Sequence, residues 1–423
     1  MLHRRRLLAA SGLLPLGPLT AVTAAAATAA PRRIVFWTMQ LSPFHDDYVR
    51  GLISRFEAAH PGVAVRWVDV PWAEMERKVL AGVAAGSAPD VVNLNPQFSS
   101  RLAEFGALAD PRQHLSASEI AAFLPPAWAA NQLAGVPFAL PWYLSTTVTL
   151  YRRDLLHAAG IAEPPRDFAA LRVAARALRE RTGSYAYFPA LDGAAALETM
   201  VAMTGALLTP NGCRPAFDNA AGAAVFAFHR ELLANRWVPP SVLTEGHRSA
   251  VAQFLSGQVA MVSTGMQFIG QLKLNNPQLH AQVGVAPQIA SAASRPNIAA
   301  MNLAVPAASR EPALAFRFAQ FVTNSENQLA LVRRVPLLPS TRASYADALF
   351  SAPSGDALLD QARAISVRQV ERGVVQVPPL RHYHKLRTSF VRGMQSAMAG
   401  RVSPEAAIAE ITRTWLPLLG CAA

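Results

Sequence analysis

Ile34-Val35-Phe36-Trp37 is the first of three β-branched, apolar runs that decide the fold class. Similar runs begin at Val63 and Val91, so that consecutive starts are separated by 29 and 28 residues. Amphipathic helical stretches lie between them, at residues 46–60 and 72–85. This is the spacing of right-handed βαβ units, and it predicts a parallel sheet covered by helices in an α/β fold.

After residue 130 the order of segments changes. Extended segments are expected at residues 135–138 and 147–151, around Pro141-Trp142-Tyr143. A hairpin is expected at residues 207–217, with Asn211-Gly212 at its turn. Further strands are expected at 259–262, 282–286 and 299–305, and everything beyond residue 311 reads as helix or loop.

Length and composition favour a globular protein of two domains. The chain has 423 residues, of which 52% are apolar and 16% are charged. The formal net charge is +12, but the cations are scattered over helical surfaces and no basic run contains interleaved aromatics, so we expect no nucleic-acid partner. The two cysteines, Cys213 and Cys421, leave a disulfide open and make a metal site improbable.

The first 29 residues read as an export signal. Arg4-Arg5-Arg6 precedes an apolar run in the manner of a twin-arginine signal, and Ala27-Thr28-Ala29 offers a cleavage site. A membrane anchor is the weaker interpretation, because the run is broken by Gly and Pro and is shorter than the ~20 residues that span a bilayer. We therefore expect a periplasmic or extracytoplasmic protein.

Enzyme motifs are missing from the sequence. It has no Gly-rich phosphate loop, no Gly-x-Ser-x-Gly, no His-Glu-x-x-His and no Cys-x-x-Cys. His382 and His384 are the best candidates for titration chemistry, but no carboxylate or thiol stands beside them in the sequence, and their role stays open. We expect no catalysis, no cofactor and no metal, with a secreted hydrolase as a distant alternative.

A binding site is better supported than a catalytic one. Ligands of open α/β sheets settle outside the carboxyl ends of the strands, where this chain carries Trp37, Gln40, Asn95 and Gln97. Trp142 and Tyr143 lie in the next crossover segment. Aromatic faces stack on the C–H faces of sugars and amides bond hydroxyl groups, although core packing is the alternative role of each aromatic ring.

Several short motifs occur in the same order along this chain as in a known protein family. They are FEAAHPGV at residues 56–63, APDVV at 88–92, GVPF at 135–138, LYRRDLL at 150–156, GQVAM at 257–261 with Gly265, and NLAVP at 302–306. From Arg33 onward the chain resembles the solute-binding proteins of ABC importers, in the group that includes the maltose-binding and glycerol-3-phosphate-binding proteins. Each motif is weak alone, and their shared order is the signal.

The resemblance implies a two-lobed fold. Each lobe would be a mixed β-sheet flanked by helices, with the ligand cleft between the lobes. Lobe 1 would comprise residues 30–140 and 288–337, and lobe 2 residues 141–287 and 338–423. Hinge crossings would fall near residues 139–146, 284–288 and 336–339. Such a protein is expected to be a monomer that closes on a small solute and delivers it to membrane permease subunits.

The resemblance also implies a set of ligand contacts. These residues are Trp37, Gln40, Asn95, Gln97, Trp142, Tyr143, Gly265, Gln267, Met301, Asn302, Arg381 and Tyr383. Asn95 and Gln97 stand where acidic side chains are frequent in sugar clefts, which favours a neutral sugar or polyol. Arg381 keeps glycerol 3-phosphate or a glycerophosphodiester open as a second choice, since a guanidinium binds phosphate bidentately.

Overall fold

The computed structural model describes residues 31–420. The export signal expected at residues 1–29 and one of the two cysteines, Cys421, lie outside the described residues. Within the described range, no helix combines the length and the apolar character needed to cross a membrane.

The strands form two main sheets and one short ribbon. Their bounds are β1 (Arg32–Met39), β2 (Val63–Val70), β3 (Val91–Leu94), β4 (Gln132–Leu133), β5 (Val136–Pro137), β6 (Leu140–Thr146), β7 (Val148–Arg152), β8 (Tyr185–Tyr187), β9 (Val259–Thr264), β10 (Val283–Pro287), β11 (Ile298–Ala304) and β12 (Leu338–Pro339).

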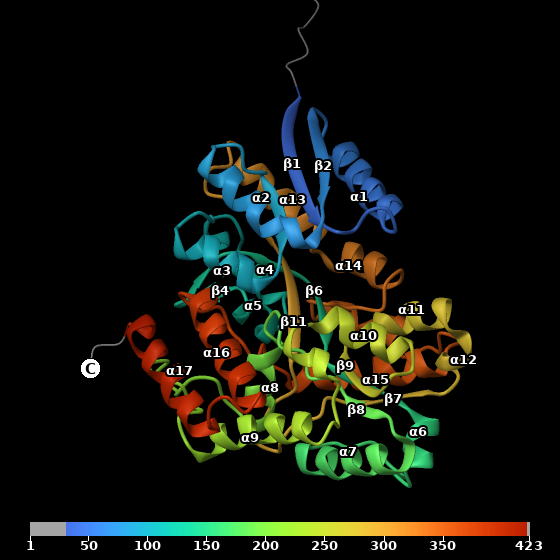
Figure 1. Cartoon of the computed structure of the whole chain (residues 1–423). Coiled ribbons are helices and arrows are strands. Elements are labelled where there is room, and N and C mark those ends of the chain that lie inside the picture. Colours follow the sequence, from blue (N-terminus) through green and yellow to red (C-terminus); the bar gives the residue numbers. More distant parts are fainter. Residues whose placement is uncertain (1–30, 421–423) are drawn as a thin grey trace, which may run out of the picture.

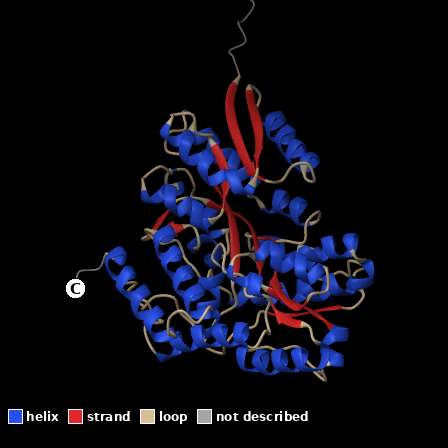
Figure 2. Cartoon of the chain, viewed as in Figure 1, coloured by secondary structure: helices blue, strands red, loops and turns tan. Residues whose placement is uncertain are grey.

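The helices cover both sheets, as the blue and red ribbons of Figure 2 show. Their bounds are α1 (Asp46–Ala59), α2 (Trp72–Ala84), α3 (Pro96–Glu104), α4 (Ala117–Ala121), α5 (Pro125–Ala129), α6 (Arg153–Ala158), α7 (Phe168–Thr182), α8 (Ala195–Thr204), α9 (Ala220–Ala234), α10 (His247–Leu255), α11 (Phe268–Asn275), α12 (Pro277–His280), α13 (Pro312–Val322), α14 (Ser325–Val332), α15 (Ala357–Arg372), α16 (Tyr383–Met398) and α17 (Pro404–Leu419). Short 3₁₀ turns are η1 (Pro111–Gln113), η2 (Pro240–Leu243), η3 (Ala343–Ala346) and η4 (Ala348–Phe350).

The larger sheet has the order β12-β6-β11-β3-β1-β2. The predicted βαβ units are confirmed, because β1 pairs in parallel with both β2 and β3. β11 joins antiparallel to β3 and β6, and β12 pairs antiparallel with β6, so the sheet as a whole is mixed. Helices α1 to α5, α13 and α14 accompany this sheet and form the part that we call the upper lobe (Figure 1).

Strand alternation sorts the apolar side chains of the upper lobe into two cores. Ile34 and Phe36 point to one face of β1 and pack with α1 and α13, whereas Met39 points to the other face and packs with α2 and α3. The buried face of α1 contains Tyr48 and Phe56, on the face that the sequence periodicity predicts. A sheet covered on both sides follows from these two cores.

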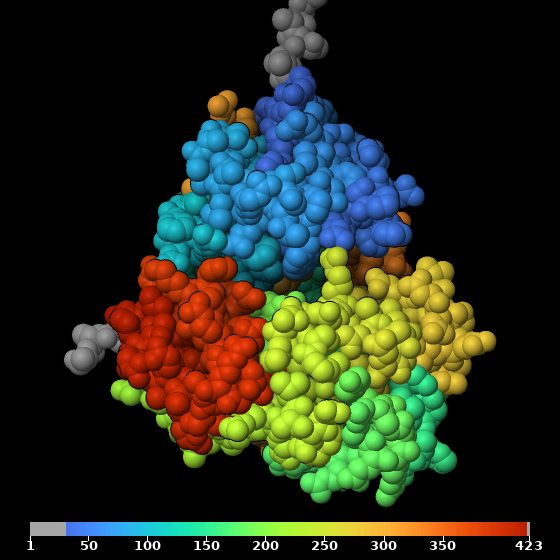
Figure 3. All heavy atoms as spheres, in the orientation of Figure 1, coloured from blue at the N-terminus to red at the C-terminus, as the bar shows by residue number. Residues whose placement is uncertain are grey.

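The smaller sheet has the order β10-β7-β9-β8 and belongs to the part that we call the lower lobe. β7 is antiparallel to β9 and β10, and β8 is parallel to β9. Helices α6 to α12 and α15 to α17 surround it, and Phe217, Phe390 and Trp415 form an edge-to-face aromatic cluster in its core. In Figure 3 the blue and cyan upper lobe stands on the green, yellow and red lower lobe.

The hairpin expected at residues 207–217 forms only as a turn. Leu208 and Pro215 make an isolated bridge, Thr209 accepts a backbone hydrogen bond from Gly212 (2.8 Å), and Gly212 adopts a φ of 73°. No strand is assigned in this described segment. The turn chemistry is therefore as predicted, but the flanking residues pack as loops against the lower-lobe helices.

Three connections join the lobes: the second begins within the predicted crossing at residues 284–288, and the first and third directly follow the predicted crossings at 139–146 and 336–339. β6 pairs with β11 as far as Thr146 and β7 begins at Val148, so the chain leaves the upper lobe at Thr147 and not before residue 141. The second connection runs from Pro287 to Ile298. The third follows Pro339, because β12 still pairs with β6 in the larger sheet. Residues 141–146 and 338–339 thus belong to the upper lobe.

The buried side-chain amide of Gln369, in the lower lobe, forms hydrogen bonds with two of these connections. Gln369 of α15 donates from Nε2 to the carbonyl oxygen of Thr147 (2.8 Å), and its Oε1 accepts from the backbone N–H of Gln288 (3.1 Å). The side chain is 5% exposed. Because buried backbone polar groups need partners, Gln369 determines the local path of both connections.

Replacement of Gln369 by Leu should therefore destabilise the protein. The change leaves the Thr147 carbonyl and the Gln288 N–H without partners, at a cost of about 1–3 kcal/mol in the free energy of unfolding. Urea denaturation measures this loss. Gln361→Leu on the exposed face of the same helix is the matched control, and an equal loss in both variants would contradict the assigned role.

Candidate functional site

A cleft of about 790 Å³ lies between the two lobes. The upper lobe contributes residues of α2 and α3, the lower lobe contributes the start of α8 and residues around the start of α16, and β11 lines the cleft between them. The carboxyl end of β3 leads directly into α3, so the cleft lies at the strand ends where ligand sites of α/β sheets are expected. A volume of this size is in the range of small-molecule sites.

Aromatic rings line both sides of the cleft. Trp72, Phe98 and Phe105 come from the upper lobe, and Tyr383 comes from the lower lobe. The rings of Trp72 and Phe98 lie 6.5 Å apart and are tilted by 52°, while Phe105 is 70% exposed. Exposed apolar side chains that gather in one groove are typical of ligand-binding surfaces.

Two polar residues of the upper wall, Asn95 and Gln97, belong to the start of α3. Asn95 caps this helix, its Oδ1 accepting from the backbone N–H of Phe98 (2.8 Å). The amide NH₂ of Asn95 is the part that remains for a ligand. Gln97 reaches the other lobe, where its Nε2 donates to the carbonyl oxygen of Val377 (3.4 Å).

Two pairs of ionisable side chains line the cleft. Arg101 Nη1 lies 2.8 Å from Glu76 Oε1. Glu104 Oε1 lies 2.9 Å from His382 Nδ1, and Glu104 Oε2 accepts from the backbone N–H of His382 (3.1 Å). The first pair neutralises charge within the upper wall, and the second joins the two walls.

Burial alters two titratable groups of the lower wall. It raises the pKa of the Glu198 carboxyl, against which a hydrogen bond with Asn297 acts in the opposite direction. Burial also raises the pKa of the Tyr383 hydroxyl, so this group stays a neutral hydrogen-bonding partner at neutral pH. Gly193 accepts from Tyr383 Oη (3.3 Å) and from Arg387 Nε (2.5 Å), which fixes α16 against the loop before α8.

Four of the twelve residues predicted to touch the ligand line the cleft: Asn95, Gln97, Met301 and Tyr383. The structure brings these together from β11, α3 and α16. Their contact with a ligand stays a prediction. The other eight residues are not among those that line the cleft, namely Trp37, Gln40, Trp142, Tyr143, Gly265, Gln267, Asn302 and Arg381.

Trp142 is a core residue in this structure, which is the alternative role that the sequence analysis left open for each aromatic ring. It has no exposed surface and packs against Phe36 (ring centroids 6.5 Å apart) and Tyr143 (5.1 Å). Trp37 is partly buried and packs against the core beside α2 and α3. Neither tryptophan lines the cleft, and of the rings that do, the sequence analysis selected only Tyr383.

Two of the polar residues predicted to contact the ligand form hydrogen bonds within the protein instead. Asn302 is fully buried, where it accepts from Ser99 Oγ (3.0 Å) and donates to Asn131 Oδ1 (2.7 Å). Gln40 has a positive φ of 55°, and its Oε1 accepts from the N–H of Trp72 at the first position of α2 (3.3 Å). These amides complete the backbone and core hydrogen bonds of the upper lobe.

The sequence analysis missed Trp72, Phe98, Phe105 and Glu104. A usable signal existed, because Phe98 and Phe105 belong to the helix and turn that follow Asn95 and Gln97. The sequence does not show in which direction α3 points, because the packing of distant elements sets its orientation. Within residues 31–420, no group of three His, Cys, Asp or Glu side chains is placed to hold a metal ion.

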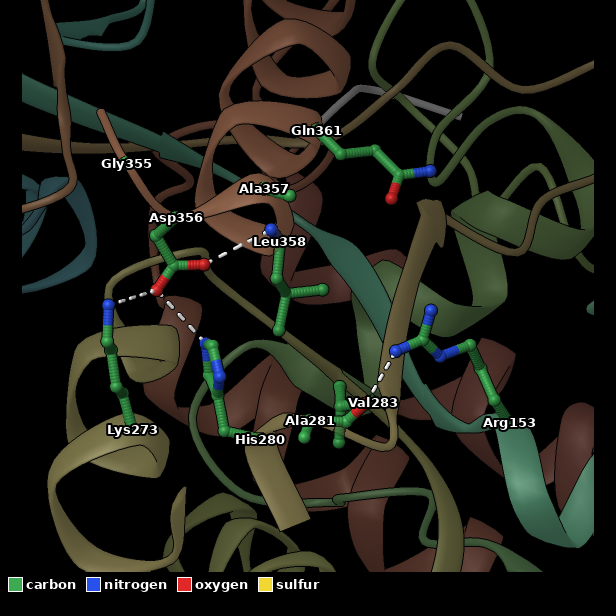
Figure 4. A pocket seen from close by; sticks show the side chains of 10 residues that line it. All are labelled: Arg153, Lys273, His280, Ala281, Val283, Gly355, Asp356, Ala357, Leu358 and Gln361. Atoms are coloured by element: carbon green, nitrogen blue, oxygen red, sulfur yellow. Dashed lines mark hydrogen bonds and ion pairs between the residues drawn. The ribbon is translucent and has the colours of Figure 1, made fainter. Parts of the chain in front are cut away.

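A second cavity, of about 310 Å³, lies in the lower lobe and is closed by its own ion pairs (Figure 4). Asp356 caps α15 and lies 3.1 Å from Lys273 Nζ and 3.0 Å from His280 Nε2. On the opposite side, Arg153 donates to the carbonyl oxygen of Ala281 (2.6 Å). These charged groups serve the packing of α12 and α15, which makes the interlobe cleft the better candidate site.

Comparison with known proteins gives consistent matches over nearly the whole chain. The model of a family described as bacterial extracellular solute-binding protein matches residues 45–329. A mannitol-binding protein of Pseudomonas aeruginosa is 25% identical over 380 residues, which cover 84% of this chain and 86% of that protein.

Solved structures resemble the chain closely in fold. A periplasmic-binding protein of Synechococcus sp. MITs9220, provisionally assigned to oligosaccharides and solved with zinc, is 33% identical with a TM-score of 0.85, covering 91% of this chain and 98% of that one. The GacH receptor of Streptomyces glaucescens, solved without ligand and with acarbose, is 24% identical with a TM-score of 0.79, covering 93% and 100%. The predicted α/β fold with two mixed, helix-flanked sheets is thereby confirmed.

The charge of Asp356 should stabilise the protein at neutral pH but not in acid. Burial alone would raise the pKa of this carboxyl, yet the bonds from Lys273, from the N–H of Leu359 and from His280 lower it below its ordinary value. A lowered pKa contributes stability above the unfolded-state value, and this contribution is lost as the pH falls through the folded-state pKa.

Asp356→Asn tests this, because Asn keeps the helix cap and removes only the charge. Urea denaturation should show a less stable variant at pH 7 and a difference from the wild type that shrinks towards pH 3. Asp347→Asn, at a cap with an exposed arginine partner, is a control expected to change little. A pH-independent difference for Asp356→Asn would contradict the assignment.

Proposed function

Because this chain belongs to the bacterial extracellular solute-binding protein family, we propose that it captures a sugar or sugar alcohol in the interlobe cleft and delivers it to an ABC importer. The observation that carries the proposal is the composition of the cleft: aromatic rings on both walls and amides on the upper wall. The family assignment identifies a binding protein, so the secreted-hydrolase alternative is dropped.

The chemistry of the walls matches a hydroxyl-rich guest. Rings such as Phe105 and Trp72 offer faces to the apolar C–H side of a sugar, and amides such as Asn95 and Gln97 offer donors and acceptors to its hydroxyl groups. The relatives named above support this choice, since one binds mannitol and another is provisionally assigned to oligosaccharides.

Closure of the lobes would allow the importer to distinguish the loaded protein from the empty one. Both lobes supply lining residues, so a solute that contacts both favours the closed arrangement and shifts the population towards it. The connection at Thr147 is the natural hinge, because this single residue separates β6 of the larger sheet from β7 of the smaller sheet. Permease subunits in the membrane would then receive the closed, loaded form.

An anionic solute is the second candidate. Lys385 lines the cleft and forms no ion pair with any described residue. It could bind the phosphate of a glycerophosphodiester, whereas the predicted phosphate ligand Arg381 is not a lining residue. A direct comparison of neutral and phosphorylated solutes decides between the two.

The cellular setting follows from the family and from the first residues. Members are extracellular, which agrees with an exported chain. We further propose that Arg4, Arg5 and Arg6 direct export by the twin-arginine route, that the mature protein begins near Ala30, and that it works as a monomer.

A thermal-shift screen of the mature protein tests the function. Mannitol, other polyols, mono-, di- and trisaccharides and glycerophosphodiesters are each added in excess. The correct solute at about 100 times its Kd should stabilise the fold by roughly 2.7 kcal/mol and raise the Tm accordingly. A screen in which no sugar or polyol raises the Tm would sink the proposal, and a response to the phosphodiesters alone would establish the second candidate.

The exposed ring of Phe105 should contribute to affinity and not to folding. Phe105→Ala is expected to weaken binding of the solute found in the screen by about 3- to 10-fold, as judged by calorimetry, with an unchanged Tm of the unliganded protein. Phe44→Ala, which removes a 90% exposed ring away from the cleft, is the matched control. Equal affinities of both variants and the wild type would exclude Phe105 as a stacking residue.

A further inference from the structure

Glu104 and His382 meet across the cleft, although they belong to different lobes. Glu104 ends α3, which packs on β11 and β4 of the upper lobe. His382 precedes α16, which packs on α8, α9 and α17 of the lower lobe. In Figure 1 the lower end of α3 faces the upper end of α16, and in Figure 3 red atoms adjoin cyan atoms at the same level.

The contact uses both oxygens of the carboxylate. Glu104 Oε1 lies 2.9 Å from His382 Nδ1, and Glu104 Oε2 accepts from the backbone N–H of His382 (3.1 Å). The carboxylate is 15% exposed, and the imidazole is 42% exposed. The Glu104 side chain is thus largely withdrawn from solvent, where hydrogen bonds to a carboxylate are stronger than in water.

The start of α16 lacks a negative group of its own. Its first turn contains no acidic residue, its cap residue His382 makes no side-chain cap and has a positive φ of 54°, and Lys385 places a cation near the positive end of the helix dipole. The Glu104 carboxylate of the other lobe supplies the missing charge and one backbone acceptor.

We propose that Glu104 and His382 form a clasp that holds the two lobes closed in the absence of solute. The clasp can form only when the lobes approach, so its free energy distinguishes the closed from the open arrangement. Gln97 adds a second bond across the cleft, to the carbonyl oxygen of Val377 (3.4 Å). The clasp regulates the site assigned above, and only its effect on solute exchange rests on the proposed function.

A clasp of this kind changes solute exchange in a defined way. It stabilises the closed form whether the cleft is empty or filled, and a solute can enter or leave only while the lobes are open. The clasp should therefore slow both association and release, and it raises affinity only as far as it raises the closed fraction of the empty protein. Glu104 acts here as a positioning residue.

Small-angle X-ray scattering of the mature, solute-free protein tests the clasp. Glu104→Ala is expected to raise the ratio of open to closed molecules by roughly two- to fivefold, seen as a larger radius of gyration, while circular dichroism shows a folded protein. His382→Ala should act in the same direction with a smaller effect, because its backbone N–H remains. The double variant should open no further than Glu104→Ala, as coupled partners do.

Glu74→Ala is the matched control. Glu74 is an acidic residue on α2 of the same lobe and pairs with Arg77 of its own helix, so its removal breaks no contact between lobes. A radius of gyration that is the same in Glu104→Ala and the wild type, or that increases equally in Glu74→Ala, overturns the clasp. A lower Tm of Glu104→Ala without any change in scattering would likewise show that the pair is a local structural contact and not a clasp.

The two proposals fail separately. The scattering experiment contains no solute, so its outcome does not depend on which sugar, if any, the protein binds. A positive thermal-shift screen together with unchanged scattering removes the clasp alone, and an opened Glu104→Ala variant with a negative screen leaves the clasp and removes the sugar.

Discussion

The short connection between β6 and β7 is the constraint on which the rest of the structure depends. Only Thr147 separates a strand of the larger sheet from a strand of the smaller one. Gln369 holds this point to the second connection through its hydrogen bonds to Thr147 and Gln288. Two sheets joined so tightly have few relative positions available, and a rotation about this place is the motion that opens or closes the space between them.

The same constraint explains which side chains form the cleft. β6 runs through the larger sheet, so its apolar side chains, Trp142 among them, pack in the cores on the two faces of that sheet. The first residues of β11 line the cleft between the lobes, and its walls consist of helix ends and the turns beside them. There, exposed rings such as Phe105 and capping amides such as Asn95 point into solvent-accessible space.

Two side-chain pairs line the cleft. Glu76 pairs with Arg101, which lowers the net charge of the upper wall, and Glu104 bonds to His382. The first pair lies within the upper lobe and shapes a wall. The second crosses between lobes, which makes it sensitive to the opening of the cleft in a way that the first cannot be.

The sequence by itself determined the βαβ start and, through the order of its motifs, the family; the family resemblance in turn implied Asn95, Gln97, Met301 and Tyr383, which line the cleft. The βαβ start follows from periodicity, because periodicity reports which face of an element is buried. Only the tertiary structure decided that Trp142 and Asn302 belong to the core, that Phe105 faces the cleft, and that Glu104 meets His382 over a separation of 278 residues. Local sequence states that a side chain is apolar or charged, but the partner that it meets depends on how distant elements pack.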